Sequence, residues 1–576
     1  MFAQDSWRAR PNLTLNYGLR WDVSTPWYET HNELETMVYG VQSLAFPGAP
    51  TGWVSPTDPT VPHTVSPIRY NNFGPRIGLA YSPNAEGGIS RRLFGGPGKS
   101  SFRTSYGIFY TAFEDATSFN AVGDAPFGYF YVNPEESSFA NPFLGLPDGS
   151  LHPQPFPAPV PPLNVSPSHP DNNIDWSALL PIGSSPGFDH TNRVPYAEHY
   201  MFSFERQITP DTLFSLSYVG TQAHHLLADQ EANPGNPALC ASLSQTSEVL
   251  AGTALCGPGE ENAVFYPVTG GTNIPGVCPA PGPPCINSTR GPFGPNFASN
   301  GLFSTMANSN YNALEASLRH TSGRATFLIG YTYSKAMDNA SSWGPGSGSG
   351  GVEIINPVNP KLGRALSAFD LTHNFVASFA YELPFDKFLH ANRATRGWIL
   401  TGITRFATGF PVFITEQDDQ SALGTGATGP TGSDVDTPNL TPGHIGRIDP
   451  RKQDLNSLTN PYLSNAASLF YLEGCPPGSG PTGSSGPGCS NRIVGQLGTA
   501  NRRFFHGPGL NNWDLGILKD LKLTESKKLE FRAEFFSVFN HAQFGNPDGN
   551  INDSVFGFVT GAGGERVGQV ALKLYF

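Results

Sequence analysis

The sequence predicts an all-β protein, an antiparallel transmembrane β-barrel with long extracellular loops. Three observations support this prediction: the composition, an alternation of apolar and polar side chains in about thirteen segments, and connections that are short and long in turn. Charged residues make up only 14% of the chain, against roughly 25% in ordinary globular proteins. Gly (65) and Pro (54) are abundant and Phe alone counts 41, a mixture that favours strands separated by turns and loops over helical bundles.

Thirteen segments have strand composition, and in most of them apolar and polar side chains alternate. Successive side chains of a strand point to opposite faces, so a strand with lipid on one side and water on the other shows a period of two. Each segment is close to the ~9–11 residues that a tilted strand needs to cross a bilayer. The predicted strands are 1–8, 13–22, 74–82, 101–112, 196–207, 212–222, 310–320, 325–336, 372–383, 397–414, 511–522, 528–539 and 567–576.

The segment 528–539 illustrates the alternation. Its odd positions from 529 to 535 are apolar, as at Phe531, and are predicted to face lipid. Its even positions carry a ladder of charges, Glu530, Arg532 and Glu534, which would then face the lumen. Charges inside a large barrel are ordinary, so we expect this ladder to form structural pairs rather than to contact a substrate.

The connections between the predicted strands are short and long in turn along the whole chain, and every long one exceeds every short one. A transmembrane barrel has tight turns on its periplasmic side and long loops outside, whereas a soluble sandwich has no reason to place all its long connections at one end. The short connections contain turn residues, as in Thr209-Pro-Asp211 and Ser322-Gly323. The long ones are rich in Pro, Gly, Ser and Asn, as in 152–170 and 424–445.

The chain ends on a strand with an aromatic carboxy-terminus. Val570, Leu572, Leu574 and Phe576 share its apolar face, and we predict that it is the closing strand of a barrel, with Phe576 at the periplasmic interface. Taken alone, the segment would also fit an edge strand of a soluble β domain. The first strand would run in the same direction as the last. Because single-chain bacterial barrels have even strand numbers, an odd count and a start without a signal peptide lead us to expect that the sequence begins inside a larger protein.

All six cysteines lie in segments rich in Gly, Pro or Ser: Cys240, Cys256, Cys278, Cys285, Cys475 and Cys489. An even number of cysteines in loops suits disulfides in an oxidising compartment. We predict a disulfide between Cys475 and Cys489, which would close a small loop. Zinc is the alternative, but the spacings are irregular, no C-x-x-C occurs and no histidine is near. The formal charge of -12 argues against nucleic acid as a partner.

Short motifs spread over nearly the whole chain carry a family resemblance: Phe2-Ala-Gln-Asp-Ser-Trp-Arg, Leu13-Thr-Leu-Asn-Tyr-Gly-Leu-Arg20, Asn72-Phe-Gly-Pro-Arg-Ile-Gly-Leu-Ala80, Tyr106-Gly-Ile-Phe-Tyr110, Tyr311-Asn-Ala-Leu-Glu315, Tyr331-Thr-Tyr-Ser-Lys335, Phe369-Asp-Leu-Thr-His-Asn374 and Phe531-Arg-Ala-Glu-Phe-Phe-Ser-Val-Phe-Asn540. Together with the terminal strand they resemble the carboxy-terminal part of TonB-dependent outer-membrane receptors, closest to the Oar-like group. The resemblance implies that 1–576 is part of a plugged barrel of ~22 strands. Such a barrel takes up a scarce ligand with energy passed through TonB. Full-length relatives begin with a signal peptide, an Ig-like domain and a plug, so this chain would contact TonB only through a plug that we do not find in it.

The resemblance also implies the partners and the location. The protein would lie in the outer membrane, in contact with its lipid, and would bind an unknown extracellular ligand through its loops and lumen. Val570, Leu572, Leu574 and Phe576 would be an assembly signal read by the barrel assembly machinery. No cofactor and no enzymatic activity are implied, and the chain shows no catalytic arrangement of residues. A structural or adhesive outer-membrane protein that does not transport is the alternative function.

Four short motifs invite a ligand-binding interpretation, and for each we expect a structural one. Gly98-Lys-Ser100 lacks the first glycine of a P-loop and is predicted to be a turn, 83–100. His224-His225 would point to opposite faces of a strand and so would not share a metal. Asp418-Asp419 is expected to be a solvated loop pair. Asp548-Gly-Asn550-Ile-Asn552 starts like a calcium loop but lacks its later glycine and acid.

Overall fold

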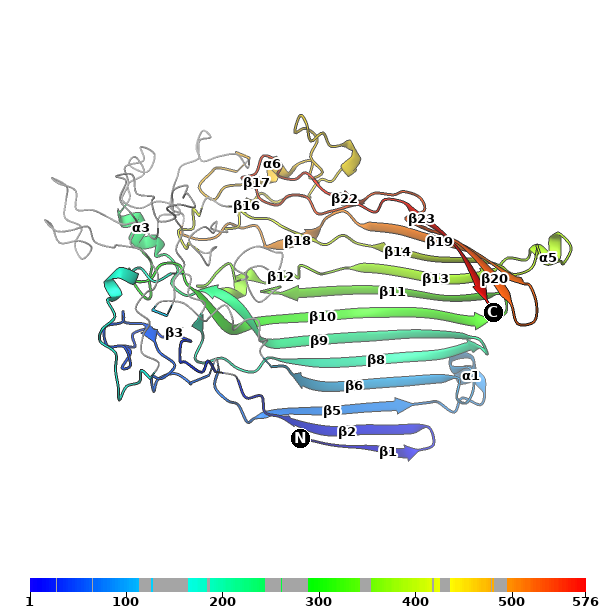
Figure 1. Ribbon diagram of the computed structural model, residues 1–576, viewed down its shortest axis with the longest axis horizontal. Helices are drawn as coiled ribbons and strands as arrows, with labels where there is room; N and C mark the ends of the chain where they lie inside the picture. Colours follow the sequence, from blue (N-terminus) through cyan, green and yellow to red (C-terminus); the bar gives the residue numbers. More distant parts are fainter. Residues whose placement is uncertain are drawn as a thin grey trace.

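The computed structural model describes residues 1–26, 28–64, 66–112, 126–127, 164–183, 187–243, 261, 289–341, 354–416, 419–424, 436–477, 479–480 and 495–576. Its main feature is one large antiparallel sheet, and most of the remaining chain gathers at one end of the strands (Figure 1). The predicted all-β fold class is confirmed.

Thirteen strands of the described chain form one continuous path in this sheet, and each pairs antiparallel with its neighbours in the path. Every one overlaps one of the thirteen predicted segments, so these predictions are confirmed. The strands are β1 (Phe2–Arg10), β2 (Leu13–Asp22), β5 (Asn72–Tyr81), β6 (Ser100–Tyr110), β8 (Tyr196–Thr209), β9 (Thr212–Glu231), β10 (Gly301–Ser322), β11 (Ala325–Asp338), β13 (His373–Glu382), β14 (Trp398–Ala407), β19 (Leu510–Lys522), β20 (Lys528–Phe536) and β23 (Val567–Tyr575).

Three predicted boundaries are wrong. β9 continues to Glu231 and β10 begins at Gly301, each nine residues beyond the predicted limit. The sequence predicts a single strand over 397–414, but β14 ends at Ala407, and β15 (Pro411–Phe413) pairs with β18 (Arg503–His506) outside the main sheet. The chain passes very close to another backbone segment at Gly409, where a Cβ atom would lie 2.3 Å from the carbonyl oxygen of Pro508. Only glycine allows this close approach, and the approach interrupts the predicted strand between β14 and β15.

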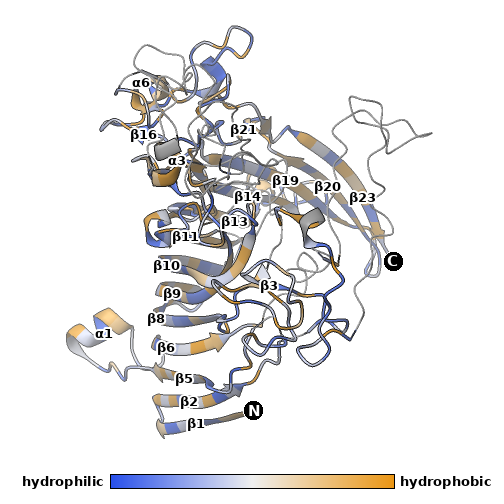
Figure 2. Ribbon diagram, turned by 90° about the vertical axis from the view of Figure 1, so that its left-hand side faces the viewer, coloured by the Kyte–Doolittle hydropathy of each residue, from blue (hydrophilic) through white to orange (hydrophobic). Residues whose placement is uncertain are grey.

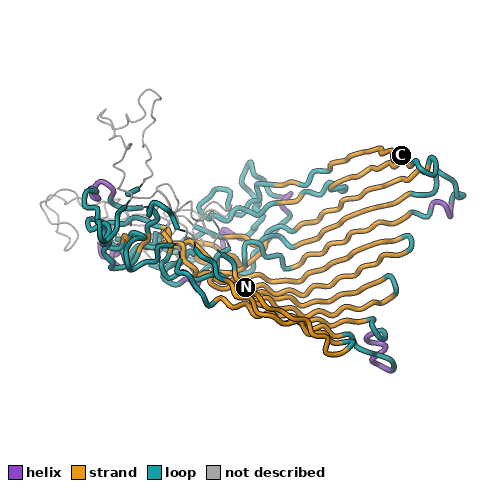
Figure 3. Tube along the Cα trace, turned by 60° about the horizontal axis from the view of Figure 1, so that its bottom comes forward, coloured by secondary structure: helices purple, strands orange, loops and turns teal. Residues whose placement is uncertain are grey.

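The two ends of the sheet differ. Short hairpins, together with α1 (Gly88–Phe94) and α5 (Phe385–Phe388), lie at one end, which we call the turn end (Figure 1). All the long connections lie at the other end, which we call the loop end (Figures 1 and 3). β1 and β23 both run toward the turn end (Figure 1). The predicted alternation of connections and the common direction of the first and last strands are therefore confirmed.

Strand register places apolar residues from neighbouring strands side by side on one face of the sheet, which we call the apolar face. Tyr17 pairs with Ile77, Ile77 with Tyr106, and Tyr106 with Tyr200. At the other edge, Phe531 pairs with Leu572. The opposite, polar face carries the alternate residues, and Figure 2 shows the alternation as successive hydrophobic and hydrophilic stretches along the strands.

Large side chains of the apolar face are exposed to the surroundings. Tyr17 is 49% exposed, Ile77 58% and Leu572 66%. Water would disfavour so many exposed apolar groups on one surface, whereas lipid accommodates them. The apolar face is therefore the lipid-facing surface, as the sequence predicts.

The sheet is curved and open at both edges (Figure 2). Among the described residues, β1 pairs only with β2, and β23 pairs only with β20. The first and last strands thus each keep one edge whose backbone groups have no strand beside them.

The connections at the loop end fold into a packed assembly with its own small elements. These are β3 (Thr36–Met37), β4 (Trp53–Val54), β7 (Gly187–Phe188), α3 (Pro237–Leu243), β12 (Ala365–Leu366), β16 (Asn439–Leu440), α6 (Ala466–Leu469), β17 (Phe470–Tyr471), β21 (Gln543–Phe544), β22 (Ala562–Gly563), and 3-10 turns at Trp176–Leu179, Pro360–Gly363 and Pro450–Lys452. No helix in the described ranges has the length and apolarity needed to cross a membrane.

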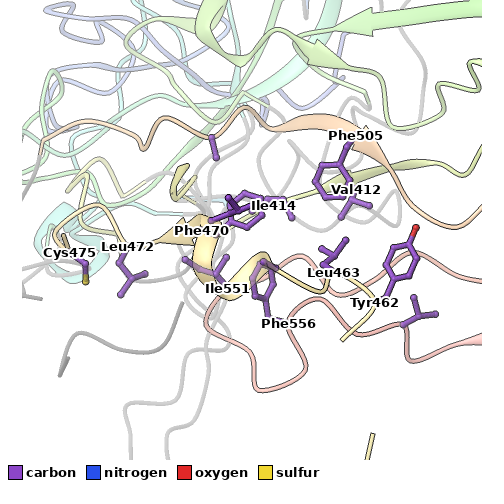
Figure 4. Packing of buried hydrophobic residues seen from close by; sticks show 14 residues of the cluster. Val412, Ile414, Tyr462, Leu463, Phe470, Leu472, Cys475, Phe505, Ile551 and Phe556 are labelled. Carbon is purple, nitrogen blue, oxygen red and sulfur yellow. The ribbon is translucent and has the colours of Figure 1, made fainter. Parts of the chain in front are cut away.

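The buried apolar residues of the protein lie mainly in this assembly rather than in the sheet. One cluster combines the β14–β19 connection with the β20–β23 connection, and Figure 4 shows Ile414, Phe470 and Ile551 packed together in it. A second cluster surrounds Trp53 and Phe297, which come from two other connections. The long connections therefore have hydrophobic cores of their own.

Candidate ligand-binding face

The polar face of the sheet carries the charged ladder predicted at β20. Lys528 bridges Asp520 of the neighbouring strand (Nζ–Oδ2, 2.7 Å) and Glu530 of its own strand (3.4 Å). Arg532 pairs with Glu530, and Gln569 of β23 donates a hydrogen bond to Glu534 (2.7 Å). The ladder forms structural pairs within and across strands, as expected.

A hollow in the polar face lies near the β1 edge, which we call the glycine hollow. It has a volume of about 780 Å³ and is lined by residues of β1, β2, β5, β6 and β8. Three glycines, Gly18, Gly78 and Gly107, lie on adjacent strands and line the hollow. The space above Gly78 would admit a Cβ atom, whereas a Cβ atom at Gly18 would lie 2.9 Å from the Cβ of Gln4 and one at Gly107 would lie 3.0 Å from the ring of Phe109. The guanidinium of Arg76 lies over the ring of Phe109, 4.4 Å from its centre. The stacked guanidinium makes this wall of the hollow suited to a planar or anionic group.

A second hollow of about 500 Å³ lies on the same face between β10 and β20, and we call it the central hollow. Its floor consists of small residues, including Ser378, Ala380 and Gly516. Leu328 and Ile403 line it although they lie on the polar face, and they are 49% and 53% exposed. The central hollow therefore offers apolar contact within an otherwise polar surface.

Buried ion pairs connect the loop end to the ends of the strands. Arg502 pairs with Asp338 at the end of β11 (Nη2–Oδ1, 2.5 Å), and both side chains are 1% exposed. Arg290 pairs with Glu231 at the end of β9 (3.6 Å). The residues joined by each of these ion pairs are far apart in the sequence. The pairs therefore form only when the sheet and the loop end come together.

Asp370 and His506 form a further pair at the loop end (Oδ2–Nε2, 2.8 Å). Burial by itself would raise the pKa of Asp370. Hydrogen bonds from His506, from the backbone N–H of Ala336 and from Thr372 outweigh burial and hold this pKa below its ordinary value. The carboxylate is therefore stabilised in its charged form.

The structure settles the placement of several predicted motifs. Gly98-Lys-Ser100 forms the end of a turn-end connection, where Lys99 donates to Gln207 (2.8 Å), as predicted. The regular strand assumed for His224-His225 is not found: His225 has a φ of 56°, the register against β10 shifts there, and both histidine rings lie near Tyr196 (5.2 and 5.8 Å). A bulge of this kind redirects a side chain to the other face. That the two histidines do not share a metal stays a prediction.

Asp419 is also placed differently from the expectation. It is fully buried rather than solvated, and its carboxylate accepts hydrogen bonds from Ser421 Oγ (3.1 Å) and the N–H of Gly424 (3.2 Å). Asp418 lies outside the described residues. In the Asp548 motif, the side chains of Asp548 and Asn550 accept from backbone N–H groups two residues later (3.0 and 3.1 Å). That pattern is a succession of Asx turns.

The cysteines are oxidised where the structure describes them. Cys240 and Cys475 are both disulfide-bonded. Cys489 lies outside the described residues, as do Cys256, Cys278 and Cys285. The pairing of Cys475 with Cys489 stays a prediction.

The terminal strand presents its apolar residues outward. Val570 is 69% exposed and Leu574 52%, and with Leu572 they lie on the apolar face opposite β20 residues. Phe576 follows the end of β23 and is 93% exposed. The geometry fits a lipid-facing last strand. A role in assembly is taken up below as a proposal.

A sheet of membrane-crossing strands with an apolar outer face, a polar inner face and all long connections at one end defines a transmembrane barrel protein. The chain belongs to the outer membrane beta barrel domain family, whose model matches residues 1–569. The protein is therefore located in the outer membrane. No curated protein matches the sequence significantly.

Solved structures similar to this chain are outer-membrane proteins. The outer membrane transporter YddB from Escherichia coli matches 100% of this chain over 44% of its own length, at 8% identity and a TM-score of 0.41. The ferripyoverdine receptor of the outer membrane of Pseudomonas aeruginosa matches 99% of this chain over 37% of its length (10% identity, TM-score 0.34). The siderophore receptor PirA from Acinetobacter baumannii matches 100% over 45% (8% identity, TM-score 0.37). The chain thus spans less than half the length of these proteins.

The two hollows were missed by the sequence reasoning. Glycine at Gly18, Gly78 and Gly107 is a visible signal, because glycine inside a strand pattern often marks a place where something approaches the backbone. Their alignment across three strands depends on register, which the alternation does not give. The buried carboxylates of the loop end were missed for the same reason and are treated below.

Proposed function

We propose that this chain is the barrel part of a TonB-dependent receptor that binds an extracellular ligand and takes it up across the outer membrane. The observation that carries the proposal is the polar face, with two hollows over small residues inside a lipid-facing sheet. The sequence motifs of TonB-dependent receptors support the mode of transport. In this proposal residues 1–576 are a partial barrel domain, and TonB acts through a plug.

The proposal also assigns the two ends of the sheet. The loop end lies outside the cell and meets the ligand first, and the turn end lies in the periplasm, as barrels of this type require. Val570, Leu572, Leu574 and Phe576 serve as the assembly signal for the barrel assembly machinery, since the first three lie exposed on the apolar face of the last strand and Phe576 lies exposed at its end. No catalytic step is part of the proposed function.

The glycine hollow is the proposed ligand contact within the lumen. Arg76 lies on its wall beside Phe109, and a guanidinium binds planar anionic groups through parallel N–H donors. A lost charge-assisted hydrogen bond weakens binding by about 1.5–3 kcal/mol, so Arg76→Gln is expected to lower the apparent affinity for the transported ligand about tenfold or more.

The experiment compares a host strain that lacks the gene with strains that carry the wild-type gene or single variants. Radiolabelled ferric siderophores, cobalamin, an oligosaccharide and a peptide mixture are offered in turn, with and without a protonophore. Energy-dependent uptake of one of them that needs the gene, and that Arg76→Gln reduces, supports the proposal. Arg103→Gln is the matched control. Arg103 lies on β6, on the same face of the sheet as Arg76, but it pairs with Glu205 (3.3 Å).

Two results would reject transport. Uptake of all the probes could be the same with and without the gene, or uptake could continue at full rate in the presence of the protonophore. If the deletion strain instead loses attachment to surfaces while uptake is unchanged, the structural or adhesive alternative is supported.

A further inference from the structure

Three acidic side chains meet inside the loop end. The carboxylate oxygens of Glu416, Asp436 and Glu473 lie within 4.8 Å of one another. Glu416 and Asp436 are fully buried and Glu473 is 8% exposed. A fourth carboxylate, Asp419, is also fully buried and is close enough to Asp436 to disfavour the charged form of that group. Buried acidic groups are costly, so a gathering of this kind requires a compensating partner.

The backbone fixes the three ligand groups relative to one another. Glu416 and Asp436 are direct partners in an antiparallel bridge, with the N–H of each donating to the carbonyl of the other (2.9 and 3.0 Å). Glu473 follows β17 closely, and the next residue, Gly474, donates its N–H to the side chain of Gln420. The segments that supply the three carboxylates are thus joined by backbone and amide contacts. A preformed group of ligands loses little freedom when it binds.

Among the described residues, Asp436 and Glu473 differ in the hydrogen-bond donors that reach them. Ser421 donates its N–H to one oxygen of Asp436 (3.0 Å) and its hydroxyl to the other (2.9 Å). By contrast, both carboxylate oxygens of Glu473 are buried, and neither accepts a hydrogen bond of good geometry from the described residues. The N–H of Gly498 favours the charged form of Glu473, but its well-formed hydrogen bond goes to the carbonyl of Thr437 (2.8 Å). The Glu473 carboxylate is directed at the oxygens of Glu416 and Asp436, which are themselves acceptors. Buried carboxylate oxygens that face one another indicate a site for a positively charged partner.

The electrostatics agree with this interpretation. Burial, and then the charges of Asp436 and Glu416, raise the pKa of Glu473. Burial, followed by the charge of Asp419, raises the pKa of Asp436. Burial and mutual repulsion therefore both disfavour the charged forms of these groups. A bound cation removes this conflict, because it favours the deprotonated form of every ligand.

We propose that Glu416, Asp436 and Glu473, with Asp419 beside them, bind a divalent cation of the calcium type. All the candidate ligand atoms are carboxylate oxygens, which suit hard cations, and among the described residues no sulfur or imidazole ligand belongs to the cluster. Calcium accepts six to eight oxygens in flexible geometry, whereas magnesium requires a near-ideal octahedron and retains its waters. An irregular group of carboxylates from three segments therefore fits calcium better.

The proposed ion would hold together three segments of the β14–β19 connection. Glu416 follows β15, Asp436 precedes β16, and Glu473 follows β17. Ile414, Leu472 and Cys475, which are neighbours of the ligands in the chain, belong to the hydrophobic cluster of Figure 4. Calcium binding would therefore couple the packing of this cluster to the ion concentration outside the cell.

The test uses the full chain, purified in detergent from outer membranes and freed of metal with a chelator. Calcium chloride is titrated at pH 7.5 by isothermal calorimetry, and thermal unfolding is followed with and without the ion. The proposal requires binding near one ion per chain, a rise in Tm with calcium, and a weaker effect of magnesium at equal concentration. Glu473→Gln keeps the shape of the side chain and is expected to weaken calcium binding at least tenfold.

Asp454→Asn is the matched control. Asp454 lies in the same connection, but its carboxylate already accepts hydrogen bonds from Ser457 (2.6 Å) and from the N–H of Asn456 (3.0 Å), so this variant should bind calcium like the wild type. Absence of calcium binding by the wild-type chain up to 10 mM would overturn the proposal, whether or not the variants fold. Undiminished binding by Glu473→Gln would also overturn it, because the ion would then occupy another place.

Discussion

Replacing Asp338 with Ala is expected to open the loop end of the protein. Asp338 is the partner of Arg502, 164 residues away in the chain, and both side chains are 1% exposed. Removing one member of a buried pair takes the ion-pair partner away from a buried charge, at a cost of about 3–5 kcal/mol. Since 1.4 kcal/mol is a factor of ten, the open population of the loop end should rise about 100-fold to several thousand-fold.

The assay is limited proteolysis of outer-membrane preparations, with the cleavage rate in the loops measured by mass spectrometry. When closing is fast relative to cleavage, this rate follows the population of the open form. A second variant, Asp338→Ala with Arg502→Met, removes both charges and should be cleaved much more slowly than Asp338→Ala alone.

The control is Asp449→Ala, which breaks an exposed pair with Arg451 (3.6 Å). Exposed pairs contribute little to stability, so its cleavage rate should stay close to that of the wild type. If Asp338→Ala is cleaved no faster than this control, or if the second change only adds further destabilisation, the buried pair does not fasten the loop end.

Two further predictions test the faces of the sheet and the pH dependence of the loop end. Phe531→Lys places a charge on the lipid-facing side, at a cost of about 2–4 kcal/mol near the bilayer centre. This variant should therefore reduce the folded fraction on heat-modifiability gels more than Glu530→Lys does. Equal losses of folded protein would contradict the assigned faces. The lowered pKa of Asp370 means that its stabilising effect is fully present above its unfolded pKa of about 3.9 and is lost as the pH falls through the folded value. Proteolysis of the loop end should therefore accelerate on acidification below about pH 4, and Asp370→Asn, already destabilised at pH 7, should show a smaller acceleration.

The strands and their faces could be predicted because they depend on local pattern. Residues two apart in a strand share a face, so Leu572 and Leu574 had to lie together whatever the rest of the chain did. The alternation also predicted that the ladder from Glu530 to Glu534 lies opposite Phe531. The break after Ala407 escaped prediction, because Gly409 acts through a close approach to Pro508 that only the folded chain creates.

The histidine pair shows a similar limit. The expectation of opposite faces for His224 and His225 assumed a regular strand, and the bulge against β10 removed that assumption. Asp419 was expected in solvent because acidic pairs in loops usually are exposed. Its burial follows from the packing of a connection that sequence composition describes only as rich in Gly, Pro and Ser.

The sequence by itself determined that this protein is an all-β barrel with one lipid-facing surface, because an alternation with period two and connections of two lengths are properties of the chain in one dimension. Only the tertiary structure decided that the long connections form a packed assembly, that three glycines align into a hollow, and that Glu416, Asp436 and Glu473 meet. These features join residues tens to more than a hundred positions apart. Their contacts depend on strand register and on which connections pack together, and no local pattern encodes either.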